Sequence, residues 1–198
     1  MAKKAKRPIN ERKIRRVMRD ICLGLKDLHK RNIIHLDIKP ENVLVSNSKK
    51  YKLGDLGLAR LVTKLVGDVP EGDSRYLAPE MLNEDPAAVV PDLTKADIFS
   101  LGIMTYEFMR NRPLPLNGDE WHDIREGRAD LKGLESYSKE LIELILLMLQ
   151  SNPIERPSAE KILNEYLLSP EQIEIKQLKM ENELLKQEIA RLKALYKE

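Results

Sequence analysis

Two short polar stretches constrain this chain more than any other feature, HLDIKPEN at residues 35–42 and GDLGLAR at residues 54–60. The first places an aspartate, a lysine and an asparagine at fixed offsets, as Asp37, Lys39 and Asn42. The second supplies Asp55, with a glycine two residues later. An acid that orients a hydroxyl, a cation for phosphate and two oxygen ligands for Mg²⁺ are the components that phosphoryl transfer requires.

The residues around these stretches predict how the two come together. A short buried strand at 33–34 leads into the first stretch, and Pro40 keeps that stretch from becoming a helix. Two strands, VLV and YKL, flank the turn SNSKK and predict a β-hairpin over residues 43–53. A hairpin returns the chain to its starting point, so we expect Asp55 beside Asn42. Gly57 is expected to supply the unusual backbone conformation of the turn that follows.

The remaining apolar patterns are helical, so the fold class is predicted to be mainly α with one short hairpin. Ile14, Val17, Ile21, Leu25 and Leu28 recur at steps of three and four, which indicates one helix face behind an Asn10 cap. Further helices are expected at 95–109 behind Thr94, at 118–127, at 137–149, and from Ser158 to 168. Residues 58–77 and 84–93 are expected to form irregular loops.

Composition excludes several classes of protein. The chain has 198 residues, enough for one domain with an appendage, and a net charge of +2, so nothing argues for a nucleic-acid or membrane partner. Its apolar runs are too short for a membrane span. The basic residues 1–8 predict a disordered end, with a nuclear-localisation patch as the alternative. Cys22 is the sole cysteine, which indicates a reduced core thiol. The expected location is the nucleus or the cytoplasm.

Residues 170–198 follow a different pattern and predict a coiled-coil helix. The residues at 175, 178, 182, 185, 189, 192 and 196 step by three and four and form a heptad seam. Asn182 is the polar residue of that seam, and a buried asparagine favours a parallel two-stranded register. We expect a homodimer through residues 175–196, with a single helix packed back on the lobe as the alternative.

The motifs resemble those of protein kinases. HLDIKPEN resembles the catalytic loop HRDxxxxN, GDLG resembles the metal-binding DFG, and residues 78–80 read APE. Arg156 matches the arginine that pairs with the APE glutamate, here Glu80, and Asp97 matches an aspartate that holds the catalytic loop. The resemblance implies the C-terminal lobe of the protein-kinase fold over residues 9–168.

It also implies roles for particular residues. Asp37 and Lys39 would be catalytic. ATP would be held by Lys39, Glu41, Asn42, Leu44 and Asp55, and Mg²⁺ by Asn42 and Asp55. The implied cofactors are therefore ATP and Mg²⁺. Met104 and Phe108 match positions beneath the adenine ring.

A narrower resemblance is to the Wee family of cell-cycle inhibitory kinases. Leu36 and Leu56 stand where most kinases have Arg and Phe, and the stretches EGDSRYL and NGDEWHDIREGR fit that family. Members of that family phosphorylate a tyrosine, and in the Myt branch also a threonine, in the glycine-rich loop of a cyclin-dependent kinase, which is the implied protein substrate. This phosphorylation restrains entry into mitosis. A charged tail without an apolar anchor favours the Wee branch over the membrane-associated Myt branch. Without an arginine at 36, activity is expected not to require phosphate on Thr63, Ser74 or Tyr76.

The N-terminal lobe of a kinase is expected to be absent. None of the nine glycines forms a G-x-G pair, and too few residues precede Asn10 to build the strands that carry the ATP lysine. We therefore expect a truncated chain, weakly active or inactive by itself. The alternative is a non-catalytic kinase lobe that acts as a dimerising interaction module; the intact Asp37, Lys39, Asn42 and Asp55 favour the enzyme.

Overall fold

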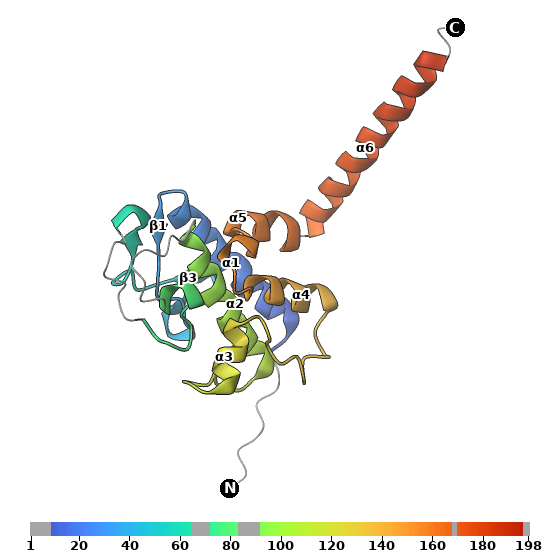
Figure 1. Ribbon diagram of the computed structural model, residues 1–198. Coiled ribbons are helices and arrows are strands. Elements are labelled where there is room, and N and C mark those ends of the chain that lie inside the picture. Colours follow the sequence, from blue (N-terminus) through green and yellow to red (C-terminus); the bar gives the residue numbers. More distant parts are fainter. Residues whose placement is uncertain (1–8, 65–71, 83–91, 168–169, 196–198) are drawn as a thin grey trace. The chain divides into compact units, whose positions relative to one another are not determined.

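The computed structural model describes residues 9–64, 72–82, 92–167 and 170–195 (Figure 1). The predictions for the basic end 1–8, for most of the loop 84–93 and for Tyr196 lie outside these residues. The chain divides into two compact units, residues 1–166 and 167–198. None of the described helices is long and apolar enough to cross a membrane.

The first unit is mainly helical, as predicted. Its longer helices are α1 (Glu11–His29), α2 (Thr94–Arg110), α3 (Asp119–Arg125) and α4 (Lys139–Met148). Short 3₁₀ turns lie at η1 (Pro40–Asn42), η2 (Val62–Lys64), η3 (Pro79–Leu82) and η4 (Pro153–Glu155). The catalytic-loop stretch therefore ends in η1, where Pro40 occupies the first turn.

Helix α1 forms for the reasons that its sequence gives. The side chain of Asn10 accepts a hydrogen bond from the backbone N–H of Arg12 at 2.8 Å and caps the first turn. The predicted face is buried at Ile14, Val17 and Ile21. Burying each such side chain stabilises the fold by roughly 1.5–3 kcal/mol.

Helix α2 is the centre of the hydrophobic core and packs against α1 and α4 (Figure 1). Its residues are buried on almost every side, including the polar Asp97, Ser100 and Thr105. The prediction that Thr94 caps this helix was wrong, because Thr94 is its first residue and the N-cap is Leu93, which makes no side-chain cap bond. Asp92 supports the first turn instead. Its carboxylate accepts from the Thr94 backbone N–H at 3.1 Å and from the Thr94 hydroxyl at 2.6 Å.

Two antiparallel strand pairs position the polar stretches. Strands β2 (Val43–Val45) and β3 (Tyr51–Leu53) form the predicted hairpin, with Val43 opposite Leu53. Strand β1 (Ile33–Ile34) pairs with β4 (Arg60–Leu61). Residues 58–77 were predicted to form an irregular loop. This prediction was wrong for residues 60–61, which form a strand because they pair with β1.

The end of the first unit is less regular than its sequence suggested. Ser158 caps the helix as predicted, accepting from the Lys161 backbone N–H at 3.1 Å. The α-helix α5 (Ala159–Lys161) then continues as the π-helix η5 (Ile162–Tyr166). In the second unit, α6 (Pro170–Leu195) is a continuous helix over most of the predicted coiled-coil segment.

Candidate active site

The site is built around Asp37, which is only 8% exposed. The Lys39 ammonium lies 2.8 Å from Asp37 Oδ2, and Asn42 Nδ2 donates to the same oxygen at 2.7 Å. Asn42 Nδ2 also donates to the Asp37 backbone carbonyl at 2.8 Å. Among the described residues both side-chain contacts fall on Oδ2, so Oδ1 is the oxygen that remains to accept a hydrogen bond from a substrate hydroxyl.

Asn42 is held in one orientation by these contacts. Its amide nitrogen is committed to Asp37, which leaves its amide oxygen as the atom able to bind a cation. The hairpin then brings the second stretch alongside, because the Gly54 backbone N–H donates to the Asn42 carbonyl at 2.8 Å. Asp55, the next residue, is thereby placed close to Asn42, as its position after the hairpin predicted.

Asp55 adopts a left-handed backbone conformation, with φ of 56°. Its carboxylate is exposed and accepts from the Gly57 backbone N–H at 3.0 Å. The prediction that Gly57 supplies the unusual conformation was wrong, since Asp55 itself takes it and Gly57 has no positive φ. Aspartate tolerates this region because its short side chain bonds its own backbone two residues on.

These two residues fit a magnesium ion, which protein carboxylates and amide oxygens bind together with substrate phosphates. The Asn42 amide oxygen and the Asp55 carboxylate are hard ligands on residues that the Gly54–Asn42 backbone bond brings near each other, and Asp55 is open to solvent. Within the described ranges no three His, Cys, Asp or Glu side chains gather as a separate metal-binding group. Asn42 and Asp55 would therefore supply two ligands of a Mg²⁺ ion, and substrate phosphates and water would supply the others.

The loop before Asp37 is fixed by a buried carboxylate on α2. Asp97 is fully buried and accepts from the backbone N–H groups of His35 at 2.9 Å and Leu36 at 3.0 Å. Its Oδ2 also lies 2.8 Å from Nε2 of His29. Leu36 has a φ of 67°, which costs a non-glycine residue about 1–2 kcal/mol. Asp97 holds the strained residue in place, and its predicted role at the loop backbone agrees with these bonds.

His35 links the two stretches through its ring. Its Nδ1 accepts from the Asp37 backbone N–H at 3.3 Å, so the proton resides on Nε2, which donates to the Gly54 carbonyl at 3.1 Å. The ring is fully buried. The His35 ring therefore ties the residue before Asp55 to the backbone of Asp37.

Lys39 carries a charge that its neighbours stabilise. The hydrogen bond to Asp37 raises the pKa of Lys39 above its ordinary value, and the negative charges of Asp73 and Glu41 add to this effect. Burial acts in the opposite direction and is outweighed. Lys39 is therefore held in its charged form beside the Asp37 carboxylate.

The end of the segment that follows Asp55 is anchored on α2 and α3. The Tyr76 hydroxyl donates to the Glu107 carboxylate at 2.7 Å, and the Ser100 hydroxyl donates to the Tyr76 carbonyl at 2.8 Å. Burial and the Glu107 carboxylate raise the pKa of Tyr76. Arg125 lies 3.7 Å from the ring centroid of Trp121 and donates to the Ser74 carbonyl at 2.6 Å. Burial lowers the pKa of Arg125 to about 10.

The segment ends at the predicted ion pair between Glu80 and Arg156. The guanidinium binds both carboxylate oxygens, at 2.6 and 2.8 Å, and both side chains are buried. The remaining donors of Arg156 bind the backbone carbonyls of Gln150, Lys95 and Ser151. An ion pair so fully satisfied fixes the start of α2 and the end of the segment relative to each other.

The residues predicted beneath a nucleotide differ in their accessibility. Leu44 is 56% exposed, and Glu41 is also exposed. Met104 is fully buried and Phe108 is half-buried, so Leu44 is the one that presents most of its surface. A separate cavity of about 390 Å³ opens between α1 and β3, and none of the predicted site residues lines it. That cavity borders the site only through Leu56.

Three contributors were missed by the motif analysis, namely His29, Arg125 and Trp121. His29 and Arg125 lie within helical patterns that read equally well as surface. The stretch NGDEWHDIREGR contains both Arg125 and Trp121, the only tryptophan of the chain, and was the signal that could have pointed to these two residues. His29 bonds the Asp97 carboxylate, and Trp121 and Arg125 bond the Ser74 carbonyl. These partners lie far along the chain, so no short sequence motif predicts them.

The sequence matches the family model described as the protein kinase domain over residues 1–168. The chain belongs to the protein kinase family. Its first unit has the fold of the kinase C-terminal lobe, with a helical core and a short hairpin at the candidate site.

Among known proteins it is similar to Wee-type kinases. It is 43% identical to a Wee1-like protein kinase of rice over 143 residues, which are 72% of this chain and 26% of the relative. It is 40% identical over 158 residues to a Drosophila membrane-associated tyrosine- and threonine-specific cdc2-inhibitory kinase, covering 79% of this chain and 28% of the relative. A Wee1-like protein kinase 1-B of Xenopus laevis is 33% identical over 206 residues, covering 90% and 33%. The chain thus spans about a quarter to a third of these relatives.

Proposed function

We propose that this chain carries the catalytic loop and the magnesium ligands of a Wee-like protein kinase, which transfers phosphate from ATP to a hydroxyl of a cyclin-dependent kinase. The arrangement of Lys39 and Asn42 on one oxygen of Asp37 is the observation that supports this most directly. A purely structural lobe has no need of a buried acid with one oxygen left open. The name of the Drosophila relative, a cdc2-inhibitory kinase, supports the substrate class.

Each side chain has a task in this proposal. Asp37 Oδ1 would receive the hydrogen bond of the attacking hydroxyl and orient its oxygen for attack. Lys39 would lie against the transferred phosphoryl group and offset its charge. Asn42 and Asp55 would hold the ion, and Glu41 and Leu44 would border the nucleotide. Mg²⁺, when bound, bridges phosphate oxygens and neutralises the charge that develops on them.

The chain alone is proposed to bind Mg·ATP weakly and to transfer phosphate negligibly. Leu44 and Leu56 present more than half of their surface to solvent, so the described residues provide a floor for the nucleotide and no roof. Isothermal titration of the chain with Mg·ATP should give a dissociation constant well above the micromolar range. Micromolar affinity would show that the site is complete without further residues and would refute this part of the proposal.

Activity is tested with the longest polypeptide that the gene encodes in frame with these residues. Purified protein, Mg·ATP labelled on the γ-phosphate and a cyclin-dependent kinase complex are incubated, and the labelled residue is identified by mass spectrometry. The expected product is phosphotyrosine in the glycine-rich loop of the substrate. The variant Asp37→Asn should lower the rate by roughly 10²–10⁴-fold.

The matched control is Asp27→Asn, the same chemical change at an exposed position of α1 away from the site. It should leave the rate unchanged. Full activity of Asp37→Asn would contradict the assigned acid, and label on other proteins alone would contradict the substrate class.

Complete absence of transfer by the parent protein would favour the second function, a non-catalytic lobe that works as an interaction module. That second function is favoured by one observation, the exposed apolar row of α6.

A further inference from the structure

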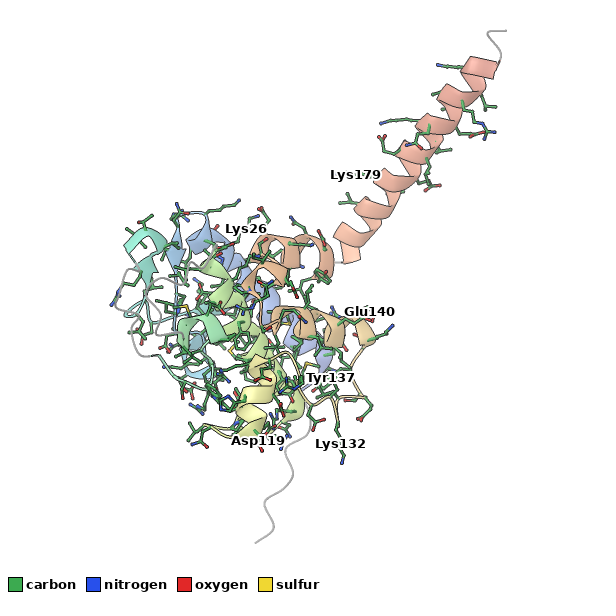
Figure 2. All side chains as sticks on the ribbon, in the orientation of Figure 1. Lys26, Asp119, Lys132, Tyr137, Glu140 and Lys179 are labelled. Atoms are coloured by element: carbon green, nitrogen blue, oxygen red, sulfur yellow. The ribbon has the colours of Figure 1, made fainter. Side chains whose placement is uncertain are left out.

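Helix α6 carries a row of large apolar side chains that have no packing partner within the described part of the second unit. Each of them is between 43% and 55% exposed: Ile175, Leu178, Leu185, Ile189 and Leu192. In Figure 2 the side chains of this helix, including the labelled Lys179, project from it around its circumference. Most of the stability of a helix in a protein comes from packing its apolar stripe against another element.

The spacing of the row specifies the geometry of that element. The apolar positions repeat every seven residues, with Ile175 and Ile189 at the a positions and leucines at the d positions 178, 185 and 192. A repeat of 3.5 residues per turn keeps one seam facing a parallel neighbour in a left-handed supercoil. β-Branched residues at a together with leucine at d favour two strands over three or four.

The charges beside the seam identify the neighbour. Lysines occupy the e positions 179, 186 and 193, and glutamates occupy the g positions 181 and 188. In a parallel pair of identical helices each g residue faces the e residue of the following heptad, so Glu181 meets Lys186 and Glu188 meets Lys193 of the other copy. In an antiparallel pair e faces e and g faces g, which would place lysine against lysine and glutamate against glutamate.

The remaining seam residue fixes the register. Asn182 lies at an a position between Ile175 and Ile189, and its side chain is exposed in the single chain. A shift by one heptad would bury the amide against isoleucine without a hydrogen-bonding partner, which is costly. In the aligned register the two asparagines face each other and bond across the seam.

From these observations we infer that α6 binds the α6 of a second copy of this chain, as a parallel, in-register, two-stranded coiled coil. The partner is an identical helix because two copies of α6 in parallel orientation place each g glutamate opposite an e lysine. In antiparallel orientation the same two copies would place like charges opposite each other. The inference is independent of the proposed kinase activity, since it uses only residues of the second unit.

The first test measures the mass of the full chain by sedimentation equilibrium over a range of concentrations. A reversible monomer–dimer equilibrium is expected. Leu185→Glu, at a d position, should raise the dissociation constant at least about a hundredfold, since it removes two seam leucines per dimer. Leu184→Glu is the matched control, because Leu184 is 60% exposed and lies off the seam one residue away. A monomer at every concentration, a trimer, or equal effects of the two variants would overturn the inference.

The second test determines orientation by cross-linking. Leu178→Cys places a thiol at a d position near one end, where two parallel helices bring it against its counterpart. Mild oxidation should give a disulfide-linked dimer, whereas Leu184→Cys should give little. Cys22 does not interfere, because its thiol is buried and burial raises its pKa to about 12. A dimer that persists without the cross-link at 178 would be antiparallel and would overturn the inference.

The third test concerns charge. The double variants Glu181→Lys with Glu188→Lys, and Lys186→Glu with Lys193→Glu, each place like charges across the seam. Each variant alone should dissociate more readily than the parent chain, and an equimolar mixture should recover a dimer that contains one copy of each. Failure of the mixture to associate more tightly than either variant alone would contradict the assigned pairing.

Discussion

Asp97 is the residue whose replacement tests the site most sharply. Its buried carboxylate accepts three hydrogen bonds, from His35 N–H, Leu36 N–H and His29 Nε2, at 2.9, 3.0 and 2.8 Å. Asp97→Asn keeps the size of the side chain and replaces one acceptor oxygen by an N–H₂ donor. In either orientation of the amide, its N–H₂ group faces the backbone N–H of His35 or of Leu36, and two donors cannot hydrogen-bond each other.

The magnitude follows from these contacts. Losing one charge-assisted hydrogen bond costs about 1.5–3 kcal/mol, and the buried N–H left unsatisfied costs roughly 1–3 kcal/mol more. We therefore expect Asp97→Asn to lower the free energy of unfolding by about 4 kcal/mol. For a protein of this size each kcal/mol corresponds to about 2–4 °C, so the melting temperature should fall by roughly 8–16 °C. Leu36, no longer held at φ of 67°, should relax first.

The assay is thermal unfolding followed by circular dichroism, together with amide hydrogen exchange at residues 35 and 36. Exchange at these two amides should accelerate more than exchange in α4, which carries none of the donors that Asp97 binds. The control Asp27→Asn, exposed on α1, should stay within about 0.5 kcal/mol of the parent. A melting temperature within about 2 °C of the parent, with unchanged exchange, would refute the reasoning.

Four further predictions concern other parts of the first unit. Arg156→Lys should cost about 3–5 kcal/mol in urea unfolding, because a lysine cannot bind both oxygens of Glu80 and three carbonyls at once; a cost below 1 kcal/mol would contradict this. Burial opposes ionisation of Glu11, but hydrogen bonds from Ser138 and Arg15 lower its pKa below the ordinary 4.5. Its contribution is therefore present above pH 4.5 and lost below it, so the gap in melting temperature between the parent and Glu11→Gln should close on acidification. A gap that widens would refute it. Cys22 should be inert to a thiol reagent at pH 8 until the chain unfolds; rapid labelling of native protein would show an open core. Ser74→Ala should leave kinase activity in the longest encoded polypeptide unchanged, since Leu36 offers no cation to a phosphate there; its loss with an unchanged melting temperature would contradict this.

Local pattern predicted a large part of the fold. The face and cap of α1, the extent of α2 within one residue at each end, and the hairpin of β2 and β3 followed from periodicity and turn residues. The pairing of Glu80 with Arg156 followed from the kinase resemblance. The helix and hairpin features could be predicted because each depends on neighbours in sequence, whereas the ion pair was predicted only because the resemblance supplies it.

Other features could not be predicted from local pattern. The strand at 60–61 exists because β1, about 27 residues earlier, supplies its hydrogen bonds. The left-handed conformation falls on Asp55 and not on Gly57, because the Asp55 carboxylate can bond the backbone that follows it. The clamp of Arg125 on the Ser74 carbonyl joins residues 51 positions apart.

By itself the sequence determined which residues stand at which spacing, namely Asp37, Lys39, Asn42 and Asp55, together with the kinase family and the heptad repeat of the last helix. Only the tertiary structure decided how that chemistry is held. Within the stretch HLDIKPEN, one carboxylate oxygen of Asp37 is bound by Lys39 and Asn42, and the other is left open. The reason is that orientation comes from buried, long-range bonds, above all those of Asp97 to the loop backbone, and sequence spacing does not encode the direction of such bonds.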